Sequence, residues 1–68
     1  MSTGEPNGFT VAVEKTEAGW KVDIHDPSGE RVSERFCSTE EEAATYASSV
    51  RQHIRWLSEP RFREYYRL

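Results

Sequence analysis

Apolar and polar residues alternate in two stretches of the N-terminal half. Residues 9–13 read F-T-V-A-V, and residues 20–25 read W-K-V-D-I-H. A period of two places successive side chains on opposite faces of a strand. Gly19, at the end of the polar stretch between them, supplies the backbone freedom that a hairpin turn needs. The pattern predicts two antiparallel strands, each with one face toward a core.

A turn and a third strand are expected next. Residues 26–29 read D-P-S-G, and these residue types suit successive positions of a β-turn. The third strand covers about residues 31–37, where Val32 and Phe36 share one face. Glu34 lies between them on that face, which leaves two interpretations. Either Glu34 lies at the margin of the sheet, or a bulge shifts the register.

A helix start follows at residues 39–42, which read T-E-E-E. This is a capping box, in which Glu42 returns to the amide of the cap residue. Apolar residues then recur at spacings of three and four, which indicates an amphipathic helix. The members of this stripe are Ala43, Ala47, Val50, Ile54 and Leu57.

Pro60 is expected to stop or kink this helix because it has no amide to donate. Glu59, which precedes it, is biased away from helical geometry. Residues 61–68 then form a last short turn or helix, with Ser58 as its cap.

The predicted fold is α+β: a three-stranded antiparallel β-meander with one C-terminal helix packed on one face (βββα), and a short extra helical turn after Pro60. Residues 1–8 are expected to be a disordered N-terminal tail, and residues 9–68 a single domain. The predicted core is Phe9, Val11, Val13, Trp20, Val22, Ile24, Val32, Phe36, Ala43, Ala47, Val50, Ile54 and Leu57. The predicted open face of the sheet, mixed in charge and without aromatics, is Thr10, Ala12, Glu14, Lys21, Asp23, His25, Arg31, Ser33 and Arg35.

Chain length and cysteine content limit how this domain can be stabilised and which cell compartment suits it. A chain of 68 residues buries only about 60% of its extended surface, so a staple or a partner is usually needed. Cys37 is the only cysteine, which excludes an intrachain disulfide and a cysteine metal cluster. A lone cysteine fits a reducing interior. The N-terminus has no signal-peptide pattern and no stretch resembles a membrane span, so we expect a cytoplasmic protein without membrane contact.

Charge is segregated along the chain. Residues 1–49 carry ten acidic and four basic residues, whereas residues 50–68 carry five arginines and two glutamates. The basic end also contains four aromatic residues. Arginine and aromatic side chains dominate protein interfaces, so this segment is the predicted contact surface. Its predicted partner-binding residues are Arg55, Trp56, Phe62, Arg63, Tyr65 and Tyr66.

Three interpretations of this segment stay open. It folds back to complete the core, or it packs against a second copy so that acidic and basic halves meet. In the third, Arg61, Arg63 and Arg67 hold a nucleic-acid backbone while the tyrosines stack on bases. We expect a homodimer or a small protein partner, with nucleic acid as the alternative.

Catalytic and metal sites are not indicated. The two histidines, His25 and His53, have no spacing that favours a pair with Cys37. The glycines are spread over separate turns and form no phosphate-binding loop. The acidic run at residues 40–42 is explained by helix initiation. We therefore predict a protein without catalytic activity, cofactor or metal.

Two family resemblances rest on turn and capping residues. Residues 19–22, G-W-K-V, and the S-G-E-R-V, S-E-R-F and S-T stretches within residues 28–39 resemble the repeat of the YegP-like family. These are small bacterial domains of unknown function, and Ser28 replaces their usual asparagine. The resemblance covers about residues 9–54. It implies a meander plus helix, no known activity, and pairing of units by self-association.

The second resemblance is to the HicB-like antitoxins. Residues 39–43, T-E-E-E-A, are similar to the Thr-x-Glu-Glu-Ala helix start of those proteins, which open with a similar hairpin. It implies binding to a small toxin, often with an attached DNA-binding segment. The chain lacks their proline-rich bend and a strand after the helix.

Overall fold

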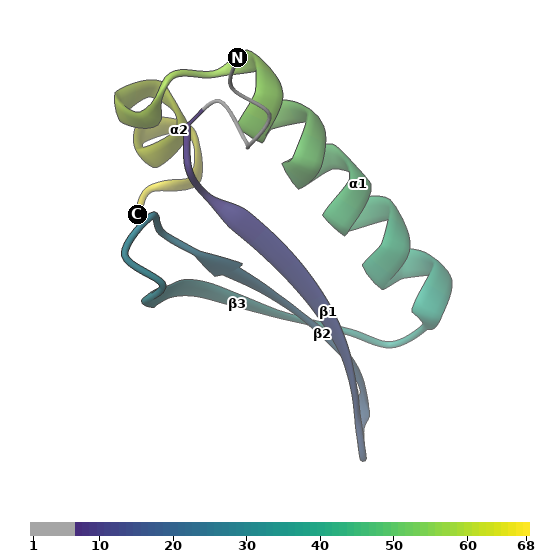
Figure 1. Ribbon diagram of the computed structural model, residues 1–68. Helices are drawn as coiled ribbons and strands as arrows, with labels where there is room; N and C mark the ends of the chain where they lie inside the picture. Colours follow the sequence, from purple (N-terminus) through teal and green to yellow (C-terminus); the bar gives the residue numbers. More distant parts are fainter. Residues whose placement is uncertain (1–6) are drawn as a thin grey trace.

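The computed structural model describes residues 7–68, and the six residues before them lie outside it (Figure 1). Three strands form one open antiparallel sheet in the order β1-β2-β3. The predicted α+β meander is therefore confirmed, but two helices follow it where the sequence predicted one helix and a short turn. The elements are β1 (Thr10–Thr16), β2 (Gly19–His25), β3 (Arg31–Cys37), α1 (Glu40–Trp56) and α2 (Glu59–Tyr66).

The β1–β2 hairpin is regular and closes at Gly19. Its register runs without a shift from Thr10 opposite His25 to Thr16 opposite Gly19. Gly19 has φ 147°, and a Cβ atom there would lie 2.6 Å from the carbonyl oxygen of Cys37. Only glycine fits this close approach of hairpin and β3.

The predicted β-turn between β2 and β3 is formed around Asp26. Its Oδ1 accepts hydrogen bonds from the Ser28 hydroxyl at 2.7 Å and from the Ser28 and Glu30 amides at 3.0 and 2.9 Å. The Ser28 hydroxyl, followed by these amides, lowers the pKa of the Asp26 carboxyl. Gly29 donates its amide to the Asp26 carbonyl at 2.8 Å, with φ 93°.

A bulge decides the register of β3. Ser33 pairs with Ile24 and Arg31 pairs with His25, so Val32 is the extra residue. Val32 packs against the core. From Ser33 onward, each side chain of β3 lies on the face opposite to the one it would occupy in a strand without a bulge. The second of the two interpretations for Glu34 is confirmed.

The bulge moves three predicted side chains to the other face. Phe36 pairs with Lys21 on the open face and is 66% exposed, so its placement in the core was wrong. Ser33 and Arg35 pair with the buried Ile24 and Val22 and therefore lie on the helix side, where the prediction had them on the open face. The open face consequently carries an aromatic side chain, contrary to expectation.

Helix α1 begins with the predicted capping box, with one difference. Thr39 Oγ1 accepts the Glu42 amide at 3.1 Å. The Glu42 carboxylate accepts the amide of Ser38 at 3.1 Å, not that of the cap residue. Both bonds satisfy amides that would otherwise lack partners at the helix start.

Most of the predicted core is confirmed, and Val13 is a second exception. Val13 is 37% exposed because β1 is an edge strand with no neighbour, among the described residues, on its outer side. Cys37 and Phe62 were missing from the predicted core and are buried. The predicted residues that are buried are Phe9, Val22, Ile24, Ala43, Ala47, Val50 and Ile54. Those that are partly buried against them are Val11, Trp20, Val32 and Leu57.

Helix α2 closes the end of the core where β1 starts (Figure 1). Glu59 is helical, contrary to the prediction, because Pro60 in the first turn of a helix needs no amide donor. The sequence predicted a disordered tail over residues 1–8. Residues 1–6 lie outside the described chain, but Asn7 is buried. Its side chain donates to the Leu57 carbonyl at 3.1 Å and accepts the Phe9 amide at 3.0 Å. Asn7 thereby ties the end of α1 to the start of β1.

Candidate functional site

The predicted contact residues of the C-terminal segment divide into an inner and an outer group. Phe62 is fully buried, and its ring centroid lies 4.6 Å from that of Phe9. The Arg63 guanidinium lies over the Phe9 ring at 5.1 Å and pairs with Glu59 at 3.2 Å. Phe62 and Arg63 therefore complete the fold, as in the fold-back interpretation.

Tyr66 belongs to the inner group and is half-buried. Its ring lies 4.7 Å from Phe62, and its hydroxyl lies 2.7 Å from His53 Nδ1. Burial raises the pKa of Tyr66 to about 12. This pair joins α2 to α1 at the edge of the core, so His53 has a packing role.

The outer group is Arg55, Trp56 and Tyr65. Trp56 is 72% exposed and Tyr65 is 61% exposed. The Tyr65 ring is tilted against the His53 ring, with the two ring centroids 4.6 Å apart. Trp56 lies three residues after His53, so the two are neighbours on the surface of α1. Trp56 and Tyr65 are thus both neighbours of His53, and we call Trp56, Tyr65 and His53 the outer aromatic surface.

A shallow groove lies beside Tyr65, and the C-terminal segment carries exposed arginines. Leu57, Arg61, Glu64 and Tyr65 line a groove of about 260 Å³. The side chains of Arg51, Arg55, Arg61 and Arg67 are exposed, and none of them forms an ion pair within residues 7–68. The segment therefore combines exposed rings with positive charge that other described residues leave unneutralised.

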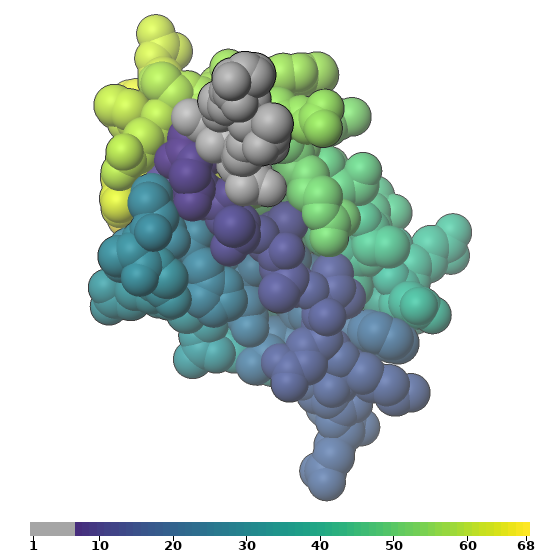
Figure 2. Space-filling model, in the orientation of Figure 1, coloured from purple at the N-terminus to yellow at the C-terminus, as the bar shows by residue number. Residues whose placement is uncertain are grey.

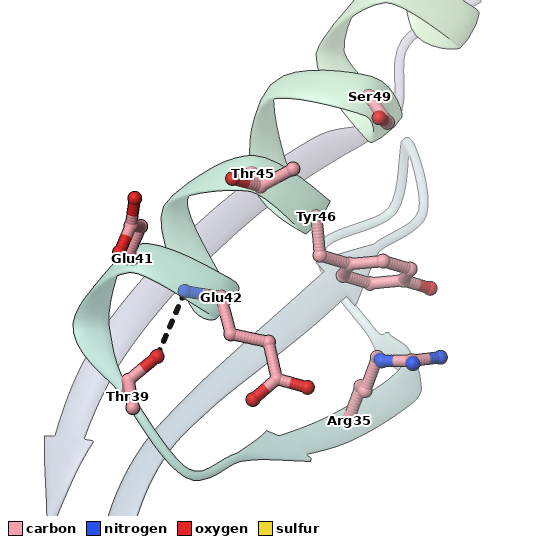
Figure 3. Close-up of a pocket in the computed structure, with 7 residues that line it drawn as sticks. All are labelled: Arg35, Thr39, Glu41, Glu42, Thr45, Tyr46 and Ser49. Atoms are coloured by element: carbon pink, nitrogen blue, oxygen red, sulfur yellow. Dashed lines mark hydrogen bonds between the residues drawn. The ribbon is translucent and has the colours of Figure 1, made fainter.

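A second groove, of about 540 Å³, lies between β3 and the first half of α1 (Figure 3). The Arg35 guanidinium lies 4.6 Å from the Tyr46 ring centroid and partly covers it. Glu42 and Thr39 at one end are engaged in the helix cap. Sequence reasoning missed this groove because it placed Arg35 on the open face and left the bulge at Val32, which turns Arg35 toward α1, as one of two interpretations.

The open face of the sheet carries an ion-pair network with Lys21 at its centre. The Lys21 ammonium lies 3.3 Å from Glu34, 3.4 Å from Glu14 and 3.7 Å from Asp23. The hydrogen bond to Glu34 is the largest cause that raises the pKa of Lys21. Arg31 joins the network at 3.2 Å from Glu34. The predicted salt-bridged character of this face is present, with Phe36 exposed beside it.

Residues 7–68 contain no group of three histidine, cysteine or acidic side chains arranged to hold a metal ion. Cys37 is a free, buried thiol. Neither helix of the described chain is long and apolar enough to cross a bilayer.

No family model, curated protein or solved structure matches the chain. The resemblances to the YegP-like and HicB-like families therefore stay predictions.

Proposed function

We propose that this chain is a non-catalytic association module that binds a protein partner through the outer aromatic surface. One observation carries the proposal. Trp56 and Tyr65 are 72% and 61% exposed, although the same segment buries Phe62 completely. The fold thus leaves two large rings in water beside a core that buries another aromatic ring of the same segment.

Leaving such rings exposed to water has an energetic cost. Removing apolar surface from water stabilises by about 25 cal/mol per Å², so two mostly exposed rings hold a considerable unused driving force for association. Tryptophan, tyrosine and arginine are also the residues most often found at the energetic centres of interfaces. The outer aromatic surface contains the tryptophan and the tyrosine, and Arg61 lines the groove beside Tyr65.

Charge indicates the kind of partner. Arg61 lines the groove beside Tyr65, Arg55 precedes Trp56 in the sequence, and neither arginine forms an ion pair within the described chain. Such positive charge accelerates the approach of a negatively charged surface and disfavours a positively charged one. We therefore expect a partner whose contact face is acidic and carries an apolar centre.

The test uses point variants, since truncation after Leu57 would remove Phe62 from the core. The full chain and the Trp56→Ala/Tyr65→Ala variant are immobilised and exposed to proteins of the source cell, with chemical crosslinking and quantitative mass spectrometry. Phe36→Ala is the matched control because Phe36 is an exposed aromatic side chain on another face. We expect a protein retained by the wild type and the control, and lost from the double variant.

Equal retention of every protein by all three chains would contradict the proposal. A second arm titrates a labelled single-stranded oligonucleotide at low and high salt. Binding that requires Trp56 and Tyr65 and falls steeply with salt would replace the protein partner with nucleic acid.

A further inference from the structure

The two edges of the sheet differ in how they resist pairing with another strand. An edge strand exposes unpaired amides and carbonyls, and proteins protect such edges with charges and bulges. The β3 edge has both: Arg31, Glu34 and Arg35 are charged, and Val32 forms a bulge. This edge is protected against addition of a strand.

The β1 edge has neither protection over its first half. Residues 9–13, F-T-V-A-V, carry no charge and no proline, and the β1–β2 register is free of bulges. Val13 is 37% exposed on this strand. In the space-filling view β1, in purple, crosses the visible surface between the green of α1 and the teal of the other strands (Figure 2). The edge is therefore regular, apolar and accessible.

Helix α1 turns a defined flank toward this edge. Its opposite flank faces β3, because Arg35 of that strand lies over the ring of Tyr46. With a helical repeat of 100° per residue, the flank on the β1 side is formed by Glu40, Ala44, Arg51 and Arg55. All four side chains are exposed, and the three charged ones form no ion pair within residues 7–68.

We propose that a second copy of this chain docks on the β1 edge, antiparallel to β1, about a two-fold axis normal to the sheet. The two three-stranded sheets become one six-stranded sheet, and the two α1 helices lie side by side and antiparallel on one face. Because α1 packs mainly over β1 and β2, strand spacing places the two helix axes about 10 Å apart, within helix-packing distance.

The register places the axis at Ala12. Val11 packs against two clusters of buried residues, one containing Val50 and Ile54 and the other containing Ala43 and Ala47. It therefore lies beneath the middle of α1. An axis at the neighbouring Ala12 pairs Val11 with Val13 of the other copy and brings no like charges opposite each other. The same axis brings Glu40 opposite Arg55 of the second copy and the small Ala44 opposite Arg51 of that copy. Charge complementarity and strand register thus select the same occupant.

This dimer is independent of the outer aromatic surface, because Trp56 and Tyr65 lie away from the β1 edge on the flank of His53. It also addresses the size of the domain. A chain of 68 residues is marginal on its own, and a continuous sheet across two copies buries the most exposed strand of each.

Disulfide crosslinking of the full chain tests the register. Ala12→Cys places two thiols directly opposite each other at the axis, within crosslinking reach. Thr10→Cys is the matched control, because the two Thr10 positions would be about 13 Å apart. We expect rapid covalent dimer from Ala12→Cys only, with the wild type unreactive since Cys37 is buried. Equal crosslinking of both variants would overturn the register.

Light scattering over a dilution series tests the edge itself. Val13→Lys inserts two charges into the interface and should raise the dimer Kd at least about tenfold, whereas Phe36→Lys on the β3 edge should leave it unchanged. Melting curves confirm that both variants are folded. A monomeric wild type at every concentration, or equal effects of the two lysines, would overturn the proposal.

Charge reversal supplies a readout that does not depend on strand stability. Glu40→Arg and Arg55→Glu should each weaken the dimer about fivefold, because two exposed ion pairs become repulsive. The Glu40→Arg/Arg55→Glu double variant restores opposite charges across the axis and should recover the wild-type Kd. No recovery in the double variant would contradict the helix pairing.

Discussion

Two sets of aromatic side chains in the C-terminal segment have different surroundings. Phe62 and Tyr66 point from α2 onto Phe9 and His53. Trp56 and Tyr65 are 72% and 61% exposed. Each set contains one tyrosine, so residue type alone does not decide which ring is structural. The helical repeat and the position of Pro60 decide it, because they fix which side of α2 meets the start of β1.

The sharpest way to test this comparison is to remove the inner ring. Phe62→Ala deletes a fully buried side chain, which costs about 3–5 kcal/mol. A domain of this length has a total stability of about 3–10 kcal/mol. We expect urea denaturation to show a largely unfolded or barely stable protein. Phe62→Leu, which keeps most of the volume, should stay folded, and equal losses for the two variants would contradict a packing role.

A smaller loss is expected at the polar residue that fixes the same end of the core. Asn7→Ala leaves the Leu57 carbonyl and the buried Phe9 amide without their partners. The expected cost is about 1–3 kcal/mol in the free energy of unfolding, measured by urea denaturation. Asn7→Asp keeps the acceptor for Phe9 but loses the donor to Leu57, so it should fall between the wild type and Asn7→Ala. An unchanged midpoint for Asn7→Ala would show that the start of β1 does not depend on this residue.

Tyr66 provides a test by pH. Its folded pKa is about 12, above the value near 10 of an unfolded tyrosine. The folded state holds the proton more tightly, so this contribution is complete below about pH 10 and is lost as pH rises toward 12. Tyr66→Phe should cost about 1 kcal/mol at neutral pH through the lost bond to His53. It should also lose less Tm than the wild type between pH 10 and 12. Parallel Tm curves would contradict the burial of the hydroxyl.

The smallest effect on stability is expected for the outer rings. Trp56→Ala and Tyr65→Ala change exposed side chains, and such substitutions are usually within about 0.5 kcal/mol. Their urea midpoints should match the wild type, while partner retention is lost. A loss comparable to that of Phe62→Ala would place these rings in the core.

The sequence predicted the parts of the fold that local chemistry controls. The hairpin, the turn at Asp26 and the cap at Thr39 follow from residue types at fixed spacings, and the structure confirms them. The bulge at Val32 is different, because it depends on how β3 meets β2 and α1 together. This one extra residue reverses the faces of β3, so the faces predicted for Phe36, Ser33 and Arg35 were wrong.

The sequence predicted the location of the candidate site but not which of its aromatic rings are buried and which are exposed. Segregated arginines and aromatics pointed to the C-terminal segment. Which rings would be exposed depended on Phe9, more than fifty residues earlier in the chain, and no local pattern records that contact. The division therefore required the tertiary structure.

The contact between Phe9 and Phe62 also constrains how the protein is made. During synthesis on the ribosome, β1, β2, β3 and α1 all emerge before the residue that covers Phe9. The nascent sheet and helix must therefore wait with one apolar ring uncovered, and the last step of core assembly follows translation of α2. The contact between Phe9 and Phe62 joins residues far apart in the sequence. Such a contact makes folding slower than the short helices and hairpins alone would suggest.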